Sequence, residues 1–352
     1  LAAAYRLQQH GHDVRVFEAA DQLGGLAATY ETRGDDVEKF YHHLSKSEET
    51  IVELAAELGL EERIEWRIGT NGYYVDGVVH PLDTPWEILA YPHMSLYDKF
   101  RLGMLTQGID VRGLVPDFDA YDDLAEYEHV TVREFVEEHT TKSVYENFVD
   151  PLLDGKYGDR KDDISAAWFL GRVRFRGERD LLRGEVLGYL DGGFGVLLDA
   201  LVEAVGRDNV VTGARVQDIG FEESVETLTV ERVSRSDTER ATGEQSDPGA
   251  SDGETTVHEV DDVVVTTMPH LLEHWTGYAC NIDFQGSVCA VVGMSEPITD
   301  TYWLNIADDA PFGALIEHTN FVPPERYGGE HLLYCASYIQ DTDEELWQLD
   351  DD

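Results

Sequence analysis

The spacing of apolar residues predicts a helix followed by a strand at the start of this 352-residue chain. An apolar helical run from Leu1 ends near Gly11, a residue type that commonly terminates helices. Val14 to Phe17 follows as a short strand and leads into Glu18. Helix, glycine and strand in this order are typical of the second half of a βαβ unit.

The middle of the chain is predicted to be mainly helical. Ser45 and Glu48 have the spacing of a capping box ahead of an apolar helical run that ends at Gly59. Asp76-Gly77 separates two short strand-like runs and predicts a tight hairpin. Helical patterns then continue to about Trp168.

Strand-like and helical patterns alternate again in the last part of the chain. Val196 to Val205 is expected to be a helix, and Val210 to Phe221 is expected to be extended. The polar stretch from Ser234 to Thr255 is expected to be a mobile hairpin extension. Val263 to Val265 has the apolar character of a buried strand.

Acidic residues greatly outnumber basic ones and give a formal net charge of −45 at pH 7. Because the acids are spread over the whole chain, they predict a generally acidic surface, which resembles that of proteins from salt-loving archaea. Such a surface repels nucleic acids and anionic membranes. No nucleic-acid partner is therefore expected.

Cysteine usage and hydropathy indicate an intracellular protein. The three cysteines show no CxxC spacing, so neither a disulfide framework nor a metal site is expected. No integral membrane segment and no signal peptide are recognised, and a cytoplasmic localisation is expected. The chain starts within a helical run and stops soon after a strand-like one, so both ends are expected to lack native sequence.

Glu18 stands where a dinucleotide-binding unit places the acid that accepts the ribose hydroxyls. The pair Gly24-Gly25 follows and permits the close backbone approach that a pyrophosphate requires. A solvated surface glutamate and a purely structural turn are the alternative interpretations. Acid and glycine pair together predict a dinucleotide cofactor.

The run from Leu1 through Thr29 resembles the start of the flavin amine oxidase superfamily, which includes protoporphyrinogen oxidases and carotenoid desaturases. The resemblance implies FAD as the cofactor, held by Glu18 and by Gly24-Gly25. It also implies that the backbone of Val216 meets the adenine, although a plain core valine is the alternative. Further segments resemble protoporphyrinogen oxidase-like members: Phe40-Tyr41-His42-His43, Pro151-Leu152-Leu153, Gly155-Lys156-Tyr157-Gly158, and Gly188 to Leu201.

The fold class expected from this resemblance is α/β. An FAD/NAD(P)-binding Rossmann-like domain would carry an inserted α+β substrate domain made of helices and a β-sheet. The FAD-binding domain is expected to comprise residues 1–60 and 187–275. The substrate domain is expected to comprise residues 61–186 and 276–352. Members usually carry a GxGxxG turn immediately before the position of Leu1.

His42 and His43 are the candidate catalytic residues, because a histidine beside a flavin can act as acid or base near neutral pH. Structural histidines that satisfy local hydrogen bonds are the alternative.

Eight basic residues lie between Lys156 and Arg183 in a chain that is otherwise acidic. If this stretch is extended, Arg172, Arg174 and Arg176 share one face, which suits recognition of a carboxylate or phosphate. A solvated basic face, or pairing with the chain's own carboxylates, is the alternative. The expected partner is therefore a small-molecule substrate that carries a carboxylate or phosphate.

The leading functional hypothesis is an FAD-dependent oxidoreductase of the amine oxidase/protoporphyrinogen oxidase type, in which hydride passes from an organic substrate to flavin. The second is a flavoenzyme like UDP-galactopyranose mutase, which works without net redox change. Lys39 and Phe40 stand where such mutases usually place a further histidine. The third is a non-catalytic binding protein on the same fold, like the escort proteins of small GTPases.

Overall fold

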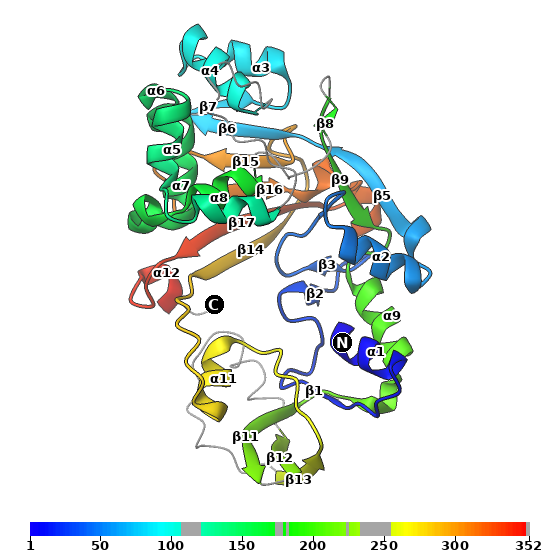
Figure 1. Cartoon of the computed structure of the whole chain (residues 1–352). Helices are drawn as coiled ribbons and strands as arrows, with labels where there is room; N and C mark the ends of the chain where they lie inside the picture. The colour runs from blue at the N-terminus through cyan, green and yellow to red at the C-terminus, as the bar shows by residue number, and fades with distance from the viewer. Residues whose placement is uncertain (107–120, 173–178, 181–182, 223–224, 233–254, 350–352) are drawn as a thin grey trace. The chain divides into compact units, whose positions relative to one another are not determined.

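The computed structural model describes residues 1–106, 121–172, 179–180, 183–222, 225–232 and 255–349 (Figure 1). The chain divides into two compact units, each assembled from separate stretches. Unit 1 comprises Leu1–Thr29, Glu57–Leu60 and Phe194–Phe284. Unit 2 comprises Tyr30–Ala56, Glu61–Gly193 and Gln285–Asp352.

This division differs from the expected domain boundaries at three places. Residues 30–56 and 187–193 group with unit 2, and residues 276–284 group with unit 1. Strand pairing accounts for the first two, because β4 (Leu44–Ser45) pairs with β9 (Gly184–Leu190), and β9 also pairs with β5 (Ile64–Gly69). These hydrogen-bonded ladders tie the stretch 30–56 to the sheet that follows it.

Unit 1 combines a short parallel strand pair, an antiparallel sheet and helices. Strand β1 (Val16–Phe17) runs parallel to β10 (Val210–Val211), as a βαβ unit requires. The expected first helix is confirmed as α1 (Ala2–Gln9), which packs on α9 (Gly195–Val205). The remaining elements of the unit are η1 (Gly25–Ala27), η7 (Arg207–Asn209), β11 (Ala214–Glu222), β12 (Val225–Arg232), β13 (Thr255–Val260) and α11 (Pro269–Thr276).

The expected buried strand at 263–265 is wrong. Among the described residues this segment makes no strand ladder, and Val264 is 58% exposed. Val263 and Val265 instead pack on the small core of the β11–β12–β13 sheet. The segment is therefore extended with one apolar face covered, which an apolar run alone cannot distinguish from a strand buried on both faces. The expected hairpin extension at 234–255 lies almost entirely outside the described residues.

Two sheets organise unit 2. The larger has the strand order β14–β17–β16–β15–β6–β7, and only β15 and β6 run parallel. Its strands are β6 (Asn71–Val75), β7 (Val78–Pro81), β14 (Gly286–Met294), β15 (Trp303–Ile306), β16 (Ala314–Glu317) and β17 (His331–Ile339). In the smaller sheet β9 lies between β4 and β5, and β8 (Arg179–Asp180) also pairs with β9. Short strands β2 (Thr29–Tyr30) and β3 (Val37–Glu38) precede them.

The predicted hairpin is confirmed between β6 and β7. Asp76 and Gly77 both have positive φ, at 52° and 77°, which is the turn geometry that favours an Asp-Gly pair. The carboxylate of Asp308 accepts hydrogen bonds from both turn amides, at 2.8 and 2.9 Å. Asp308 thus binds both central residues of the hairpin turn at the edge of the larger sheet.

The predicted helical region forms a separate layer of unit 2 (Figure 1). Its largest buried side chains include Tyr91, Phe135 and Tyr145, which form one core cluster with Tyr73 of the hairpin. The helices of this region are α3 (Pro85–Ala90), α4 (Leu96–Thr106), α5 (Val132–His139), α6 (Lys142–Val144), α7 (Asp150–Tyr157) and α8 (Ala166–Leu170), while α2 (Glu49–Glu57) and α12 (Glu345–Gln348) lie elsewhere in the chain. Turns of 3-10 or π type are η2 (Glu61–Arg63), η3 (Tyr121–Tyr127), η4 (Tyr145–Val149), η5 (Gly158–Asp163), η9 (His318–Asn320) and η10 (Pro324–Tyr327). Within the described residues no helix is long and apolar enough to cross a bilayer.

One of two capping motifs behaves as its sequence suggests. Thr131 caps α5 and exchanges hydrogen bonds with Glu134, which makes a full capping box. The Ser45 box is wrong as a helix cap, because α2 begins only at Glu49. Glu48 still accepts a hydrogen bond from the backbone of Ser45 at 2.6 Å, so the pair closes the turn before the helix.

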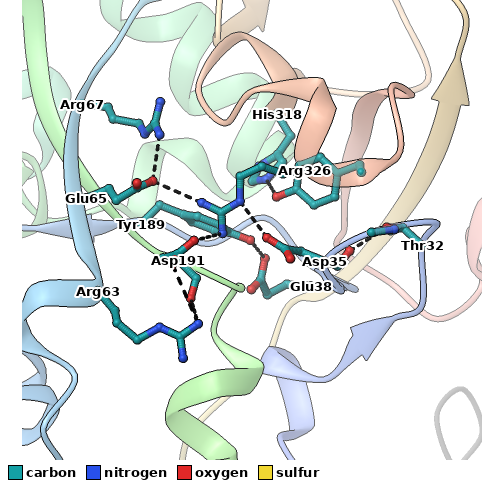
Figure 2. A network of polar contacts seen from close by, with 12 residues as sticks. Thr32, Asp35, Glu38, Arg63, Glu65, Arg67, Tyr189, Asp191, His318 and Arg326 are labelled. Atoms are coloured by element: carbon teal, nitrogen blue, oxygen red, sulfur yellow. Dashed lines mark hydrogen bonds and ion pairs between the residues drawn. The ribbon is translucent and has the colours of Figure 1, made fainter.

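Arg326 joins several segments of unit 2 through one guanidinium group (Figure 2). Its Nε donates to Asp35 at 2.6 Å, its Nη1 donates to Glu65 at 3.2 Å, and its Nη2 forms an ion pair with Asp191 at 2.8 Å. The Arg326 side chain is only 15% exposed. Its backbone oxygen would lie 2.0 Å from a Cβ added at Gly34, so this approach requires glycine.

Beneath Arg326 lies a buried hydrogen-bonded set of side chains. Glu38 is fully buried, and its carboxylate accepts a hydrogen bond from Tyr189 at 2.7 Å, while its backbone oxygen accepts one from Tyr334 at 2.7 Å. His318 lies 2.6 Å from the hydroxyl of Tyr327. Burial, followed by the charge of Arg326, lowers the pKa of His318 to about 3, so this histidine is neutral at pH 7.

We expect Arg326→Met to lower the free energy of unfolding by about 2–4 kcal/mol, because three carboxylates would lose the cation that they share. The control is Arg33→Met, since Arg33 is 76% exposed in its ion pair with Glu330. That change should cost less than about 1 kcal/mol. Urea unfolding followed by circular dichroism measures both, and equal losses would contradict the role given to Arg326.

Candidate functional site

Glu18 occupies the carboxyl end of the parallel strand β1 in unit 1. Its backbone amide donates to Val211 at 2.9 Å, and its backbone oxygen accepts from Ala214 at 2.8 Å. One carboxylate oxygen accepts a hydrogen bond from the amide of Ala20 at 2.9 Å. The side chain is therefore fixed in direction while its second oxygen can accept a ligand hydroxyl, at the strand end where α/β folds bind their ligands.

Gly24 is required by both conformation and packing. Its φ is +120°, and an added Cβ would lie 2.8 Å from Cδ1 of Leu198 on α9 and 2.9 Å from the amide of Ala28. The loop that follows Glu18 thus lies directly against the helix, which only a residue without a side chain allows.

Gly25 differs from its neighbour. Its φ is +56°, but apart from Gly25 itself and its two chain neighbours no heavy atom of the described residues lies within 4 Å of the Cβ position. Open space around a backbone in the left-handed region is compatible with close approach of a ligand phosphate. Gly24 is therefore required by its packing against α9, whereas Gly25 is favoured by its backbone conformation. The sequence pattern alone does not distinguish these two requirements.

Val216 lies in the same corner of unit 1 as Glu18. It follows two residues after Ala214, whose amide bonds the Glu18 backbone, and it pairs with Val230 on β12. Its side chain packs on the core of the small sheet. An irregularity in strand register follows Val216, and such bulges re-aim backbone groups near ligand sites. The structure thus brings Val216 close to Glu18 in the fold, although 198 positions separate them in sequence.

His42 and His43 belong to unit 2 and are half-buried. Nδ1 of His42 lies 2.6 Å from the backbone oxygen of Phe40. Because a carbonyl only accepts, Nδ1 carries the hydrogen and Nε2 is the nitrogen that can take up a proton. Nδ1 of His43 lies 3.0 Å from the hydroxyl of Tyr302, and its ring contacts Trp303 edge-on.

Aromatic side chains gather on one face of the larger sheet. The Tyr41 hydroxyl lies 2.9 Å from that of Tyr338, and the Tyr41 ring meets Trp303 at 4.8 Å and Tyr334 at 6.1 Å in edge-on geometry. Trp303 and Tyr334 share this face because both align with Ile316 on the strand between them. Such edge-on contacts are the favoured arrangement of aromatic rings.

Two cations accompany these rings. Lys156 Nζ lies 5.3 Å from the ring centre of Tyr338 and 5.4 Å from that of Trp168, and Arg172 Cζ lies 5.0 Å from Trp168. All three distances are within cation–π range. Burial and the neighbouring Tyr338 raise the pKa of Tyr41, and the charge of Arg172 opposes that rise, so Arg172 acts on the same group.

We call this set the aromatic–cationic cluster. Its members are Tyr41, Lys156, Tyr157, Trp168, Arg172, Trp303, Tyr334 and Tyr338. Flat π faces beside two positive charges suit a planar ligand that carries an anionic group.

The predicted arginine face is only partly described. Arg172 is exposed and continues the helical turn after α8, so it is not on a strand. Arg174 and Arg176 lie outside the described residues. Sequence reasoning missed Lys156 and Trp168 as partners of Arg172, because the three meet through helix packing and not through strand alternation.

The neighbouring thiol is not set up for chemistry. Burial raises the pKa of Cys289 to about 12, which keeps it protonated at neutral pH. All three cysteines are free thiols.

An α/β unit with an acid at the end of a parallel strand and a glycine loop on a helix defines a dinucleotide-binding protein. The chain belongs to the family of flavin-containing amine oxidoreductases, whose family model matches residues 1–352. The expected recognition, fold class and FAD cofactor are thereby confirmed.

Individual relatives agree with this family. Coproporphyrinogen III oxidase of Mycobacterium tuberculosis is 30% identical over 226 residues, which cover 57% of this chain and 48% of that protein. The chain spans about a third to a half of the length of the curated relatives it matches.

Solved structures share the fold at low sequence identity. A protoporphyrinogen oxidase-like protein from Exiguobacterium is 16% identical with a TM-score of 0.66, over 96% of this chain and 74% of that one. Reduced UDP-galactopyranose mutase is 14% identical with a TM-score of 0.61, over 99% and 73%. These similarities support the fold alone.

We expect Gly24→Ala to lower the free energy of unfolding by about 2–4 kcal/mol, because its Cβ meets both Leu198 and backbone at positive φ. Gly25→Ala is the matched control, where only the left-handed backbone opposes the change, at about 1 kcal/mol. Thermal unfolding of both variants measures the difference. A larger loss for Gly25→Ala would refute the packing assigned to Gly24.

Proposed function

We propose that the chain forms the cofactor- and substrate-binding parts of an FAD-dependent oxidoreductase in which hydride passes from an organic, anionic substrate to flavin. The observation that carries this proposal is the aromatic–cationic cluster on the larger sheet of unit 2. Bound FAD supplies the hydride acceptor, and the protein supplies position, electrostatics and exclusion of water. Because its cysteines are free thiols, we place the protein in a reducing compartment such as the cytoplasm.

In this proposal Glu18 holds the adenosine ribose, and Gly24 and Gly25 carry the backbone past the pyrophosphate. Glu18 suits this role because the amide of Ala20 already orients its carboxylate. Hydrogen bonds from ribose hydroxyls to a charged acceptor are stronger than those to a neutral one. The backbone of Val216, on the neighbouring strand, would meet the adenine.

On the substrate side Lys156 and Arg172 bind the anionic group, and the rings of the cluster other than the fully buried Tyr334 carry the apolar body. The relative named coproporphyrinogen III oxidase suggests a porphyrinogen as one substrate of this type. His42, with Nε2 as its basic nitrogen, can accept the proton that must leave when hydride is removed. His43, which contacts Tyr302, is the second candidate for that role.

We expect Glu18→Gln to weaken FAD binding about tenfold or more, since a charge-assisted hydrogen bond contributes about 1.5–3 kcal/mol. Gln can retain the oxygen that accepts from Ala20, and it removes the charge and replaces the second acceptor oxygen with an NH2 group that donates. Glu259→Gln is the control, because Glu259 is an exposed acid on β13 of the same unit. Quenching of flavin fluorescence measures the affinity, and equal effects of the two variants would exclude Glu18 from the site.

The substrate assignment is tested by mixing FAD-loaded protein with a porphyrinogen without oxygen and following the bleaching of the oxidised flavin. We expect Lys156→Gln and Arg172→Gln each to raise the substrate concentration for half-maximal bleaching rate about tenfold. Arg183→Gln, in the same basic stretch but paired with Asp180 at 2.8 Å, should leave it unchanged.

Other outcomes decide against the proposal. Faster bleaching by a cationic diamine than by a carboxylate-bearing substrate would exclude anion recognition by Lys156 and Arg172. Isomerisation of UDP-galactopyranose by the dithionite-reduced protein, without net oxidation of the flavin, would favour the mutase alternative. A chain that binds no FAD would favour the non-catalytic alternative.

A further inference from the structure

The backbone carbonyl of Lys156 is bound by two side chains that are distant in sequence. Lys156 lies in the last turn of α7, where backbone oxygens have no partner within the helix. Its oxygen accepts hydrogen bonds from Nε2 of Gln285 at 2.5 Å and from Nε2 of Gln340 at 3.4 Å. The end of the helix that carries Lys156 is therefore capped by side-chain amides.

Gln285 and Gln340 lie at the same end of the β14–β17 ladder. Gln285 precedes β14 and Gln340 follows β17, and the adjoining residues Gly286 and Ile339 are register partners. Their two amide groups reach one carbonyl oxygen, which has two lone pairs to accept them. We call Gln285 and Gln340 the glutamine clamp.

Close contacts hold the same turn against the larger sheet. A Cβ added at Gly313, between β15 and β16, would lie 2.4 Å from the backbone oxygen of Gly155. Gly158 ends α7 with a φ of +51°, and its Cβ position lies 3.3 Å from Cγ of Gln340. The turn that carries Lys156 is thus fixed at its first, second and last residues.

Three aromatic rings lie around the ammonium group of Lys156. Its Nζ is 5.3 Å from the ring centre of Tyr338, 5.4 Å from that of Trp168 and 5.8 Å from that of Tyr157. Tyr338 stands on β17, two residues before Gln340, so the clamp and one of the rings come from the same strand end. A lysine side chain has many rotamers, and a fixed backbone limits the positions that its ammonium can reach.

We propose that the glutamine clamp positions Lys156 among the three rings and thereby gives the site its preference for an anionic ligand over a neutral one. This inference rests on the anion-binding role of Lys156 in the proposed function. The clamp acts through Lys156 and not by contact with the ligand. Because the ammonium is ordered before a ligand arrives, less side-chain freedom is lost on binding and the affinity is higher.

Calorimetric titration of the full chain with naphthoate and with naphthylmethanol tests the proposal. Both probes are flat and similar in size, but only naphthoate carries a charge. We expect Gln285→Met to weaken naphthoate binding about fivefold, because the carbonyl of Lys156 loses its shorter hydrogen bond, and to leave naphthylmethanol binding unchanged. Gln340→Met should have a smaller effect of the same kind, since its hydrogen bond is longer.

A double-mutant cycle shows whether the clamp acts through Lys156. Lys156→Gln alone should weaken naphthoate binding about tenfold. Addition of Gln285→Met to that variant should cause no further loss, because no ammonium remains to be positioned. Losses that simply add would show that the cap only stabilises the end of α7, and they would overturn the proposal.

The matched control is Gln348→Met. Nε2 of Gln348 also donates to a backbone oxygen, that of Thr342 at 2.6 Å, but this side chain is exposed and outside the aromatic–cationic cluster. The control should bind both probes like the wild type.

The remaining outcomes separate the two proposals. If Lys156→Gln weakens naphthoate binding and neither clamp variant does, the positioning role fails and the anion site stands. If the wild type binds naphthoate no more tightly than naphthylmethanol, the anion site fails and the positioning role fails with it. Equal losses of both probes in Gln285→Met also overturn the positioning role. Circular dichroism checks that each variant is folded, and Gln340→Met provides the same comparison if Gln285→Met is not.

Discussion

The arrangement of unit 2 depends on the shared guanidinium of Arg326. Asp35, Glu65 and Asp191 come from segments far apart in the sequence, and each meets the same cation. Like charges this close would repel without it. Below them, buried Glu38 is held by Tyr189 and Tyr334. Glu38 thus anchors the chain just before Tyr41 and His43, whose rings contact Trp303 on β15, and the Tyr41 hydroxyl lies beside that of Tyr338 on β17.

Charge also matters where basic side chains locally interrupt the overall excess of acidic residues. Lys156 and Arg172 stand over aromatic rings in a chain with a net charge of −45. In the proposed function an anionic ligand would be repelled by the acidic surface and attracted at this position.

Local sequence signals predicted the elements that local chemistry controls. The hairpin at Asp76-Gly77 and the capped helix after Thr131 formed as expected, because positive φ and side-chain caps depend on near neighbours. The prediction was wrong for the Ser45 cap, where strand pairing of β4 continues to Ser45 itself. It was wrong again at 263–265, where an apolar run packs on a sheet without joining a ladder.

The sequence by itself determined the family, the cofactor and the acid at the end of β1, because these rest on residue types at short, regular spacing. Only the tertiary structure decided that Trp168 and Lys156 accompany Arg172, and that Asp98 and Lys99 are buried while Phe100 is exposed. Such contacts depend on which helix faces pack together, and the energy of burying a charge depends on partners that are distant in sequence. For that reason the cluster could not be predicted from spacing alone.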